Sequence, residues 1–255
     1  MFVYLAAAAC AAGVVIVASR LVRRARAGVD DPDPDGPTSA HTGAMLSALF
    51  LLAFAIAVVV PWTSADAARS NTYAESQAIA ETYWAAARLP APEARRVQEG
   101  LSAYVATVRG PEWRLMAQGR LSSRGWAQLD RLRRDVIAVK VGDDELKDAR
   151  NGVLEHLGEV SAARRQRAAD ARATPPAALA AVTVLTGIVV VLLPFLAGAR
   201  PRGMTLVPLA LMAALLAAGT YLTFDIAHVF DGALAVGPEA YTSLQSDLQR
   251  IAGGR

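Results

Sequence analysis

The sequence is poor in the residues that build disulfides, metal centres and most catalytic sites. It contains one cysteine, Cys10, in 255 residues, which excludes an intrachain disulfide and a cysteine-based metal or redox cluster. The three histidines, His41, His156 and His228, lack the spacing of metal ligands. The fingerprints of metalloproteases, α/β-hydrolases, P-loop proteins and dinucleotide-binding enzymes are also absent. The sequence therefore predicts no enzymatic activity, no metal and no organic cofactor.

Charged residues are scarce as well, at 19% of the chain, whereas 54% of the residues are hydrophobic. An average soluble domain has about 25% charged residues. The apolar residues gather in four runs, residues 2–19, 44–62, 177–198 and 204–224, and none of these runs has an ionisable residue near its middle. Each run is long enough to cross a hydrocarbon core of roughly 30 Å. The sequence predicts an all-α, multi-pass integral membrane protein with four transmembrane helices.

The polar remainder divides the chain into four parts. Residues 1–62 hold transmembrane helices one and two and an acidic, proline-rich loop; residues 63–175 form a helical water-facing domain; residues 176–224 form a transmembrane hairpin; and residues 225–255 form a C-terminal tail. In the acidic loop, the spacing D-P-D-P-D-G is that of a calcium loop, but Thr42 takes the place of the required bidentate glutamate. We therefore interpret this loop as a solvated turn.

The water-facing domain has a helical pattern throughout, because alanine, arginine, glutamate and leucine dominate it. A helix over residues 66–88 continues the second transmembrane run and ends before Pro90, and a helix over residues 93–108 ends at the Gly110–Pro111 pair. Further helices are expected to start at Ser122 or Ser123 and in the acidic stretch 142–145. The first and last of these helices are predicted to be continuous with transmembrane helices.

The basic residues argue against one class of partner, nucleic acid, but do not show which side of the membrane the large domain faces. Nucleic-acid binding needs a basic face with aromatic or groove-reading residues, which the sequence lacks. Six arginines flank the two short loops and five flank the large domain, so the rule that basic loops face the cytoplasm does not choose a side. The predicted partners are the lipid bilayer, further copies of the chain and a protein.

Several short patterns between residues 75 and 245 are shared with one family. They comprise Glu81-x-x-Trp84 leading to Pro90, Leu101-x-x-Tyr104 followed by Glu112-Trp113, an Arg164-Arg165-x-Arg167 stretch, and a closing segment from His228 to Tyr241 with Phe230, Gly232 and Pro238. In this order and spacing the chain resembles a bacterial membrane family described as bestrophin-like. Val229 stands where that family usually has proline.

The resemblance implies a location in the plasma (inner) membrane and a function. Bestrophins are pentameric anion channels whose second transmembrane helix lines a narrow apolar neck, with the large domain and both termini in the cytoplasm. Their neck has two phenylalanines four residues apart and then a tryptophan, a pattern that Phe50, Phe54 and Trp62 repeat here. The resemblance thus assigns Phe50 and Phe54 to a pore. The alternative is that the two rings, which share one helix face, pack against lipid or a neighbouring helix.

Two functions remain open from the sequence. One is a homo-oligomeric anion channel with an apolar neck. The other is a membrane-anchored helical scaffold or sensor, without transport activity, which binds a protein through residues 64–174.

Overall fold

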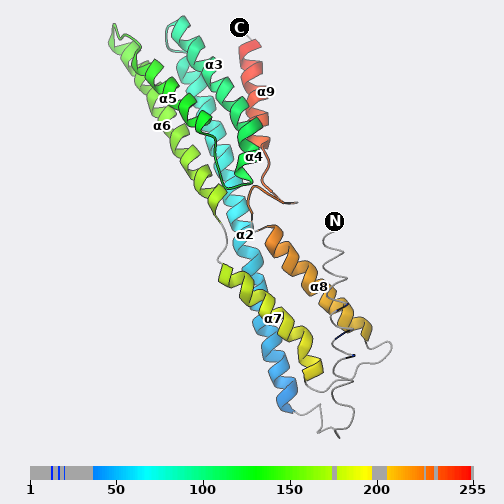
Figure 1. Ribbon diagram of the computed structural model, residues 1–255. Helices are drawn as coiled ribbons and strands as arrows, with labels where there is room; N and C mark the ends of the chain where they lie inside the picture. The colour runs from blue at the N-terminus through cyan, green and yellow to red at the C-terminus, as the bar shows by residue number, and fades with distance from the viewer. Residues whose placement is uncertain are drawn as a thin grey trace. The chain divides into compact units, whose positions relative to one another are not determined.

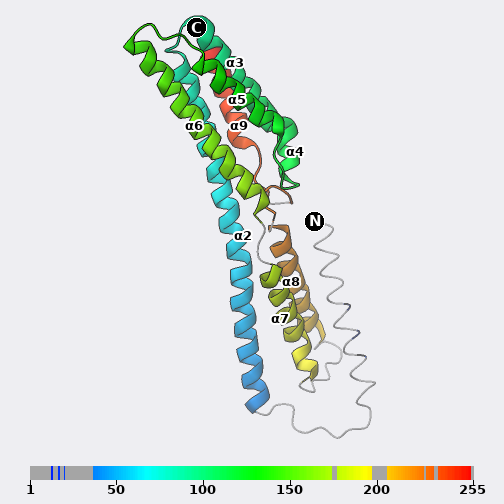
Figure 2. The same cartoon turned by 60° about the vertical axis from the view of Figure 1, so that its left-hand side comes forward.

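The computed structural model is helical throughout the residues that it describes, and these fall into two compact units (Figures 1 and 2). The described residues are 37–173, 177–196, 206–226, 228–232 and 235–253, together with Gly13, Val17 and Arg20. Unit 1 comprises Met1–Trp62 and Thr174–Ala227, and unit 2 comprises Thr63–Ala173 and His228–Arg255. Apart from Gly13 and Val17, the first apolar run lies outside the described residues. So do the acidic loop 31–36 and the turn 199–203.

Helix α2 (Pro37–Ala86) is a single helix of 50 residues. From position 44 onwards it contains no glycine and one proline, Pro61, through which the helix continues. At its C-terminus the N–H groups of Ala87, Arg88 and Leu89 donate to carbonyls three residues back, which tightens the last turn before Pro90. The prediction that the second transmembrane run continues as one helix into the following domain is confirmed. The companion prediction, that the last helix of that domain is continuous with the third run, is wrong, because the helix ends at Arg172 and Ala173 has an extended backbone.

The structure contains one helical segment, among the described residues, that is long and apolar enough to cross a bilayer, Phe50–Ala86. Helices α7 (Ala177–Leu196) and α8 (Leu206–Asp225) occupy the third and fourth predicted runs. Their apolar stretches, Ala181–Leu192 and Ala210–Asp225, are shorter than a full span. Helices α7 and α8 pack against each other. Four membrane spans therefore stay a prediction.

Unit 2 also contains α3 (Ala91–Thr107), α4 (Trp113–Met116), α5 (Ser123–Ile137), α6 (Asp144–Arg172) and α9 (Glu239–Gly253). The predicted helix starts are confirmed, and each has a side-chain cap: the Ser122 side chain accepts a hydrogen bond from the N–H of Arg124, and the Asp143 side chain accepts one from the N–H of Leu146. Helix α5 packs against both α3 and α6.

The predicted break at Gly110–Pro111 is wrong. The chain continues from α3 through a π-helical segment, η1 (Val108–Glu112), into α4. Pro111 has no N–H for an ordinary helical bond, and the wider turn accommodates it, since the N–H of Trp113 donates to the carbonyl of Val108 five residues back.

Helix α9 belongs to the core of unit 2. Four of its side chains, those of Ala240, Tyr241, Leu244 and Leu248, are buried in one apolar cluster with residues of α2, α3, α5 and α6. The Ser76 hydroxyl of α2 donates to the carbonyl of Ala240 over 3.1 Å. Helix α9, expected as part of a tail, thus completes the helical bundle of unit 2.

Candidate functional site

Unit 2 encloses five polar side chains that are withdrawn almost completely from solvent. They are Glu75 of α2, Tyr104 of α3, Glu112 of η1, and Arg164 and Arg167 of α6, each with an exposed fraction of 0%. We call this set the buried charge cluster. Its two carboxylates and two guanidinium groups balance in formal charge. Four elements of the bundle meet in it.

Arg167 joins the two carboxylates of the cluster. Its Nε and Nη2 atoms donate to the two oxygens of Glu75 over 2.7 and 3.0 Å. Its Nη1 atom donates to Oε1 of Glu112 over 3.0 Å. The ring of Tyr241, from α9, lies with its centroid 5.5 Å from the guanidinium carbon, within the range of a cation–π contact. Arg167 therefore ties α2, η1 and α9 to α6.

Arg164 makes a bidentate pair with Glu112. Its Nη1 and Nη2 atoms donate to Oε1 and Oε2 of Glu112, both over 2.6 Å, the fork geometry that makes arginine–carboxylate pairs strong. Nη2 also donates to the carbonyl of Ser122 over 2.9 Å. The ring centroid of Trp126 lies 4.8 Å from the guanidinium carbon. This second pair fixes the start of α5 against α6.

Tyr104 bridges the two ion pairs. Its hydroxyl donates to Oε1 of Glu75 over 2.5 Å and accepts from Nη1 of Arg164 over 3.1 Å. Burial and the neighbouring Glu75 carboxylate together raise the pKa of Tyr104 well above its ordinary value. The hydroxyl is therefore a proton donor at every physiological pH.

The cluster keeps its charges because each is paired. Burial lowers the pKa of Arg167, but the Glu75 carboxylate and the neighbouring tyrosines together outweigh burial, so the pKa lies well above its ordinary value. Removing one partner of a buried pair leaves the other charge uncompensated and costs about 3–5 kcal/mol. Such a network favours one register of the surrounding helices over others. Among the described residues no group of three or more acidic, histidine or cysteine side chains could hold a metal ion.

Four residues of the family motif, Tyr104, Glu112, Trp113 and Phe230, lie in or beside the buried charge cluster. Tyr104 and Glu112 belong to it, and Trp113 packs edge-on against Phe230 and Tyr241, with centroid distances of 5.6 and 5.8 Å. Phe230 is buried with Met116, the sulfur of which contacts Arg167. The motif residues thus position the network and its apolar support.

The remaining motif residues shape the backbone or lie on the surface. Gly232 has a φ of 102°, a backbone conformation that residues other than glycine rarely adopt. The carbonyl of Pro238 accepts from the N–H groups of Tyr241 and Thr242 at the start of α9, and the carbonyl of Pro90 does the same for Ala94 at the start of α3. Trp84 is exposed.

Phe50 and Phe54 lie in unit 1, with their rings stacked at a centroid distance of 5.8 Å. Phe50 is buried, and its ring would lie 3.3 Å from a Cβ atom added at Gly187 of α7. The ring of Phe54 would lie 2.6 Å from one added at Gly219 of α8. Each ring thus packs against a glycine of the same chain, the contact that the helix-packing alternative requires. Their assignment to a pore stays a prediction.

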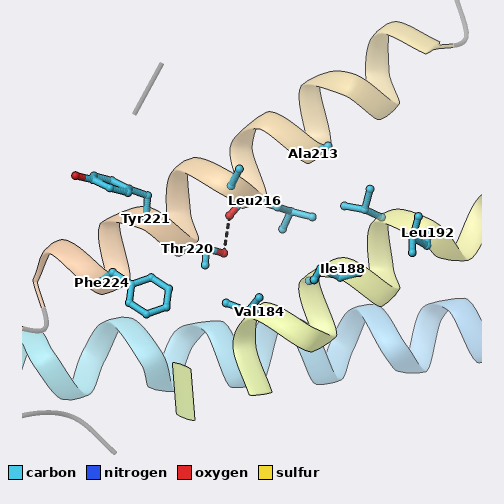
Figure 3. A pocket seen from close by; sticks show the side chains of 11 residues that line it. Val184, Ile188, Leu192, Ala213, Leu216, Thr220, Tyr221 and Phe224 are labelled. Atoms are coloured by element: carbon cyan, nitrogen blue, oxygen red, sulfur yellow. Dashed lines mark hydrogen bonds between the residues drawn. The ribbon is translucent and has the colours of Figure 1, made fainter. Parts of the chain in front are cut away.

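Helices α7 and α8 also enclose an apolar groove of about 380 Å³, open along one side (Figure 3). Its lining includes Ile188, Leu216 and Phe224, and the hydroxyl of Thr220 is satisfied by the carbonyl of Leu216. The groove therefore has an almost wholly apolar lining.

Sequence reasoning did not assign a site role to Glu75, Arg164 or Arg167. A signal for the two arginines was present, since they extend the apolar stripe of α6 that contains Val153, Leu157 and Val160 at helical spacing. That stripe is buried over its whole length. An arginine at such a position predicts a buried partner.

A comparison with known families supports the family resemblance that the motif residues indicate. No curated protein matches the chain, and no solved structure matches it. A family model described as Bestrophin-like domain matches residues 5–241, most of the chain. The chain belongs to the bestrophin-like family.

Proposed function

We propose that the protein is a homo-oligomeric, pentameric anion channel of the membrane, with an apolar neck on helix α2 and no enzymatic activity. The single observation that carries the proposal, besides family membership, is an exposed apolar face within unit 1. It comprises Leu52, Ile56 and Val59, spaced four and three residues apart, so that they share one helix face. Within the described part of the chain these side chains stay exposed.

An apolar ring of this kind suits anion passage with gating. A hydrophobic constriction closes by dewetting and opens when it admits water. The middle of the apolar run contains no ionisable residue, so no fixed negative charge repels an anion there. Further copies of α2 around a common axis would form such a ring.

Either of two faces of α2 could line the neck. Phe54 and Ile56 are two residues apart, which places them on roughly opposite sides of the helix. Phe50 and Phe54, the residues that the family resemblance names, contact α7 and α8 in the single chain, whereas Leu52, Ile56 and Val59 do not pack in this way. Only one of the two faces can point toward the axis.

Chloride flux from liposomes that contain the purified protein tests the proposal. Ile56→Glu would place a ring of like charges in a low-dielectric throat and should reduce chloride flux strongly. Leu185→Glu, at an exposed position on α7, is the matched control and should leave flux near the wild-type value. Flux that responds to Phe54→Ala but not to Ile56→Glu would assign the neck to the phenylalanine face. Absence of wild-type flux over a range of pH and calcium concentration would refute the channel.

The second candidate is a membrane-anchored helical scaffold or sensor that binds a protein through residues 64–174. The observation that favours it is that unit 2 exposes two aromatic side chains, Tyr73 and Trp84, on helix α2. A scaffold would purify with a stoichiometric partner and show no flux. A channel would conduct when it is purified alone.

A further inference from the structure

Within unit 2, helix α2 carries an exposed face unlike the other surfaces of the bundle. Tyr73 and Trp84 have exposed fractions of 51% and 53%. They are 11 residues apart, close to three helical turns, and so lie on one line along the helix. The only other large apolar side chain exposed in the described part of unit 2 is Ile137 of α5. Two of the three thus lie on the same face.

The part of this face from Ser70 to Ala80 has no exposed charge, and the exposed Glu81 borders the face beside Trp84. Between Arg69 and Glu81 the exposed residues of α2 are Ser70, Tyr73, Ala74 and Gln77. On α6, a stretch of the same length exposes Glu155, Glu159 and Arg165. A helix that faces only water has no physical need to avoid charge, and α6 shows the usual composition. The α2 face therefore has the composition of a surface that packs against protein.

We propose that this α2 face, defined as Ser70, Tyr73, Gln77 and Trp84, is a contact surface between copies of the chain whose α2 helices run parallel. The inference rests on the proposed homo-oligomer and names the surface through which unit 2 assembles. Copies that insert into one bilayer with the same topology have parallel α2 helices. Each side chain then meets its own counterpart at the same height.

A partner that is a second copy of the chain explains why the face lacks exposed charge from Ser70 to Ala80. A charged residue on such a face would meet a like charge in the next copy, and like charges at close range repel. A different protein could instead supply a complementary charge, so a face built for it would gain from charged residues. The absence of exposed charge from Ser70 to Ala80 therefore favours a second copy over an unrelated partner.

The spacing of the face suits helix–helix packing. Positions 70, 73 and 77 follow steps of three and four residues, and position 84 follows one heptad after position 77, which is the spacing of a coiled-coil seam. Tyr73 and Trp84 supply the large rings of this seam, and each aromatic ring buries a large apolar area on contact. Between and beside them stand a serine, a glutamine and an alanine. The small side chain of the exposed Ser70 leaves room for a ring of the neighbouring helix.

Gln77, at the centre of the face, is suited to contact with the Gln77 of a second copy. Its side-chain amide has both hydrogen-bond donors and an acceptor, so the amides of two parallel copies that meet at one height can bond to each other. A single polar residue on a coiled-coil seam can specify the register and the number of helices. The glutamine therefore fits a contact between like helices without bringing like charges together.

Cysteine crosslinking in native membranes tests the proposal. In a Cys10→Ser background, Ser70→Cys and Gln77→Cys should form crosslinked dimers rapidly on mild oxidation or with a short bifunctional maleimide. Asn151→Cys, an exposed position on α6, is the matched control and should remain largely monomeric on a denaturing gel. We expect at least a five-fold difference in crosslinked fraction.

The outcomes separate this inference from the channel proposal. Crosslinking at positions 70 and 77 no greater than at 151, in protein whose mass shows several copies, would overturn the α2 contact. Chloride flux without α2 crosslinks would overturn the inference alone, whereas α2 crosslinks without flux would support it and refute the channel. As a second variant, Tyr73→Glu combined with Trp84→Glu adds like charges to the face and should lower the mass of the assembly in detergent.

Discussion

The two units of the chain bury their interiors by different means. Unit 2 places two arginine–glutamate pairs in its core, with every charge held at an exposed fraction of 0%. The described core of unit 1 is mainly apolar, with Phe50, Ala57, Phe195 and Ala213 buried and the Phe50 and Phe54 rings seated on glycines. In unit 2 directed hydrogen bonds add to a large apolar core in fixing the helices, whereas the described helices of unit 1 are held mainly by the fit of apolar side chains. Unit 2 is therefore sensitive to a lost charge as well as to added volume, and unit 1 mainly to added volume.

Because of this difference, we expect the loss of a buried charge in unit 2 to lower the stability of the protein more than a single substitution in unit 1. Arg167→Met would leave Glu75 buried without its guanidinium partner, which should destabilise the protein by about 3–5 kcal/mol. Arg165→Met changes an exposed arginine two positions away and should alter stability by no more than about 0.5 kcal/mol. Thermal unfolding in detergent, followed by tryptophan fluorescence, measures both. Equal shifts for the two variants would show that the buried pairs do not stabilise unit 2.

Crowding the cluster is expected to have a smaller effect than removing a charge. A Cβ atom at Gly125 would lie 2.4 Å from Nη2 of Arg164, so Gly125→Ala should cost about 1–3 kcal/mol as the guanidinium shifts. Gly152, on α6, has no atom within 4 Å of such a Cβ. Gly152→Ala should stabilise the protein by roughly 0.5–1 kcal/mol. A gain in thermal stability for both alanine variants would contradict the placement of Arg164.

Unit 1 should respond to added volume beside its rings. A Cβ atom at Gly219 would lie 2.6 Å from the Phe54 ring, so Gly219→Ala should destabilise the protein by about 1–2 kcal/mol. Phe54→Leu combined with Gly219→Ala should cost clearly less than the sum of the two single variants, because the residues touch. Apparent melting temperatures of the wild type, the two single variants and the double variant give this double-mutant cycle. Strict additivity would show that the Phe54 ring lies elsewhere, as it would in a pore.

The smallest effect concerns alkaline pH. Because burial and Glu75 raise the pKa of Tyr104, the folded protein keeps this proton when the unfolded chain loses it near pH 10. Stability should be unaffected by this group below pH 10 and should fall above it by about 1.4 kcal/mol per pH unit. Melting temperatures at pH 8, 10 and 11 should therefore decline less steeply for Tyr104→Phe than for wild type. Tyr73→Phe, at an exposed tyrosine, should leave the decline unchanged, and an unchanged decline for Tyr104→Phe would contradict the buried hydrogen bond.

Local signals in the sequence were sufficient for most helices. Caps at Ser122 and Asp143 and the stop before Pro90 act over a few residues, so the sequence predicts them directly. The π-helical segment was missed because Gly110–Pro111 normally ends a helix, and here the bundle stabilises a wider turn. Helix α9 was missed because its burial depends on α2, far away in the chain.

The buried charge cluster was less accessible to sequence reasoning than the fold. Arginine and glutamate are expected at the surface, and only the helical spacing of Arg164 and Arg167 with the apolar residues of α6 argues otherwise. Glu75 carries no such local signal, because its partner Arg167 lies 92 positions away. The motif residues Tyr104, Glu112, Trp113 and Phe230 could be named from the family resemblance. Their convergence on one network required the structure.

The mass of the intact assembly tests the central claim, that several copies of this chain form one membrane protein, most directly. Native mass spectrometry of the full-length protein, released from mild detergent, resolves multiples of the 26.8 kDa chain. We expect a dominant species of five copies and no appreciable monomer. A monomer that persists across detergents and with added lipid would contradict both the channel and the α2 contact.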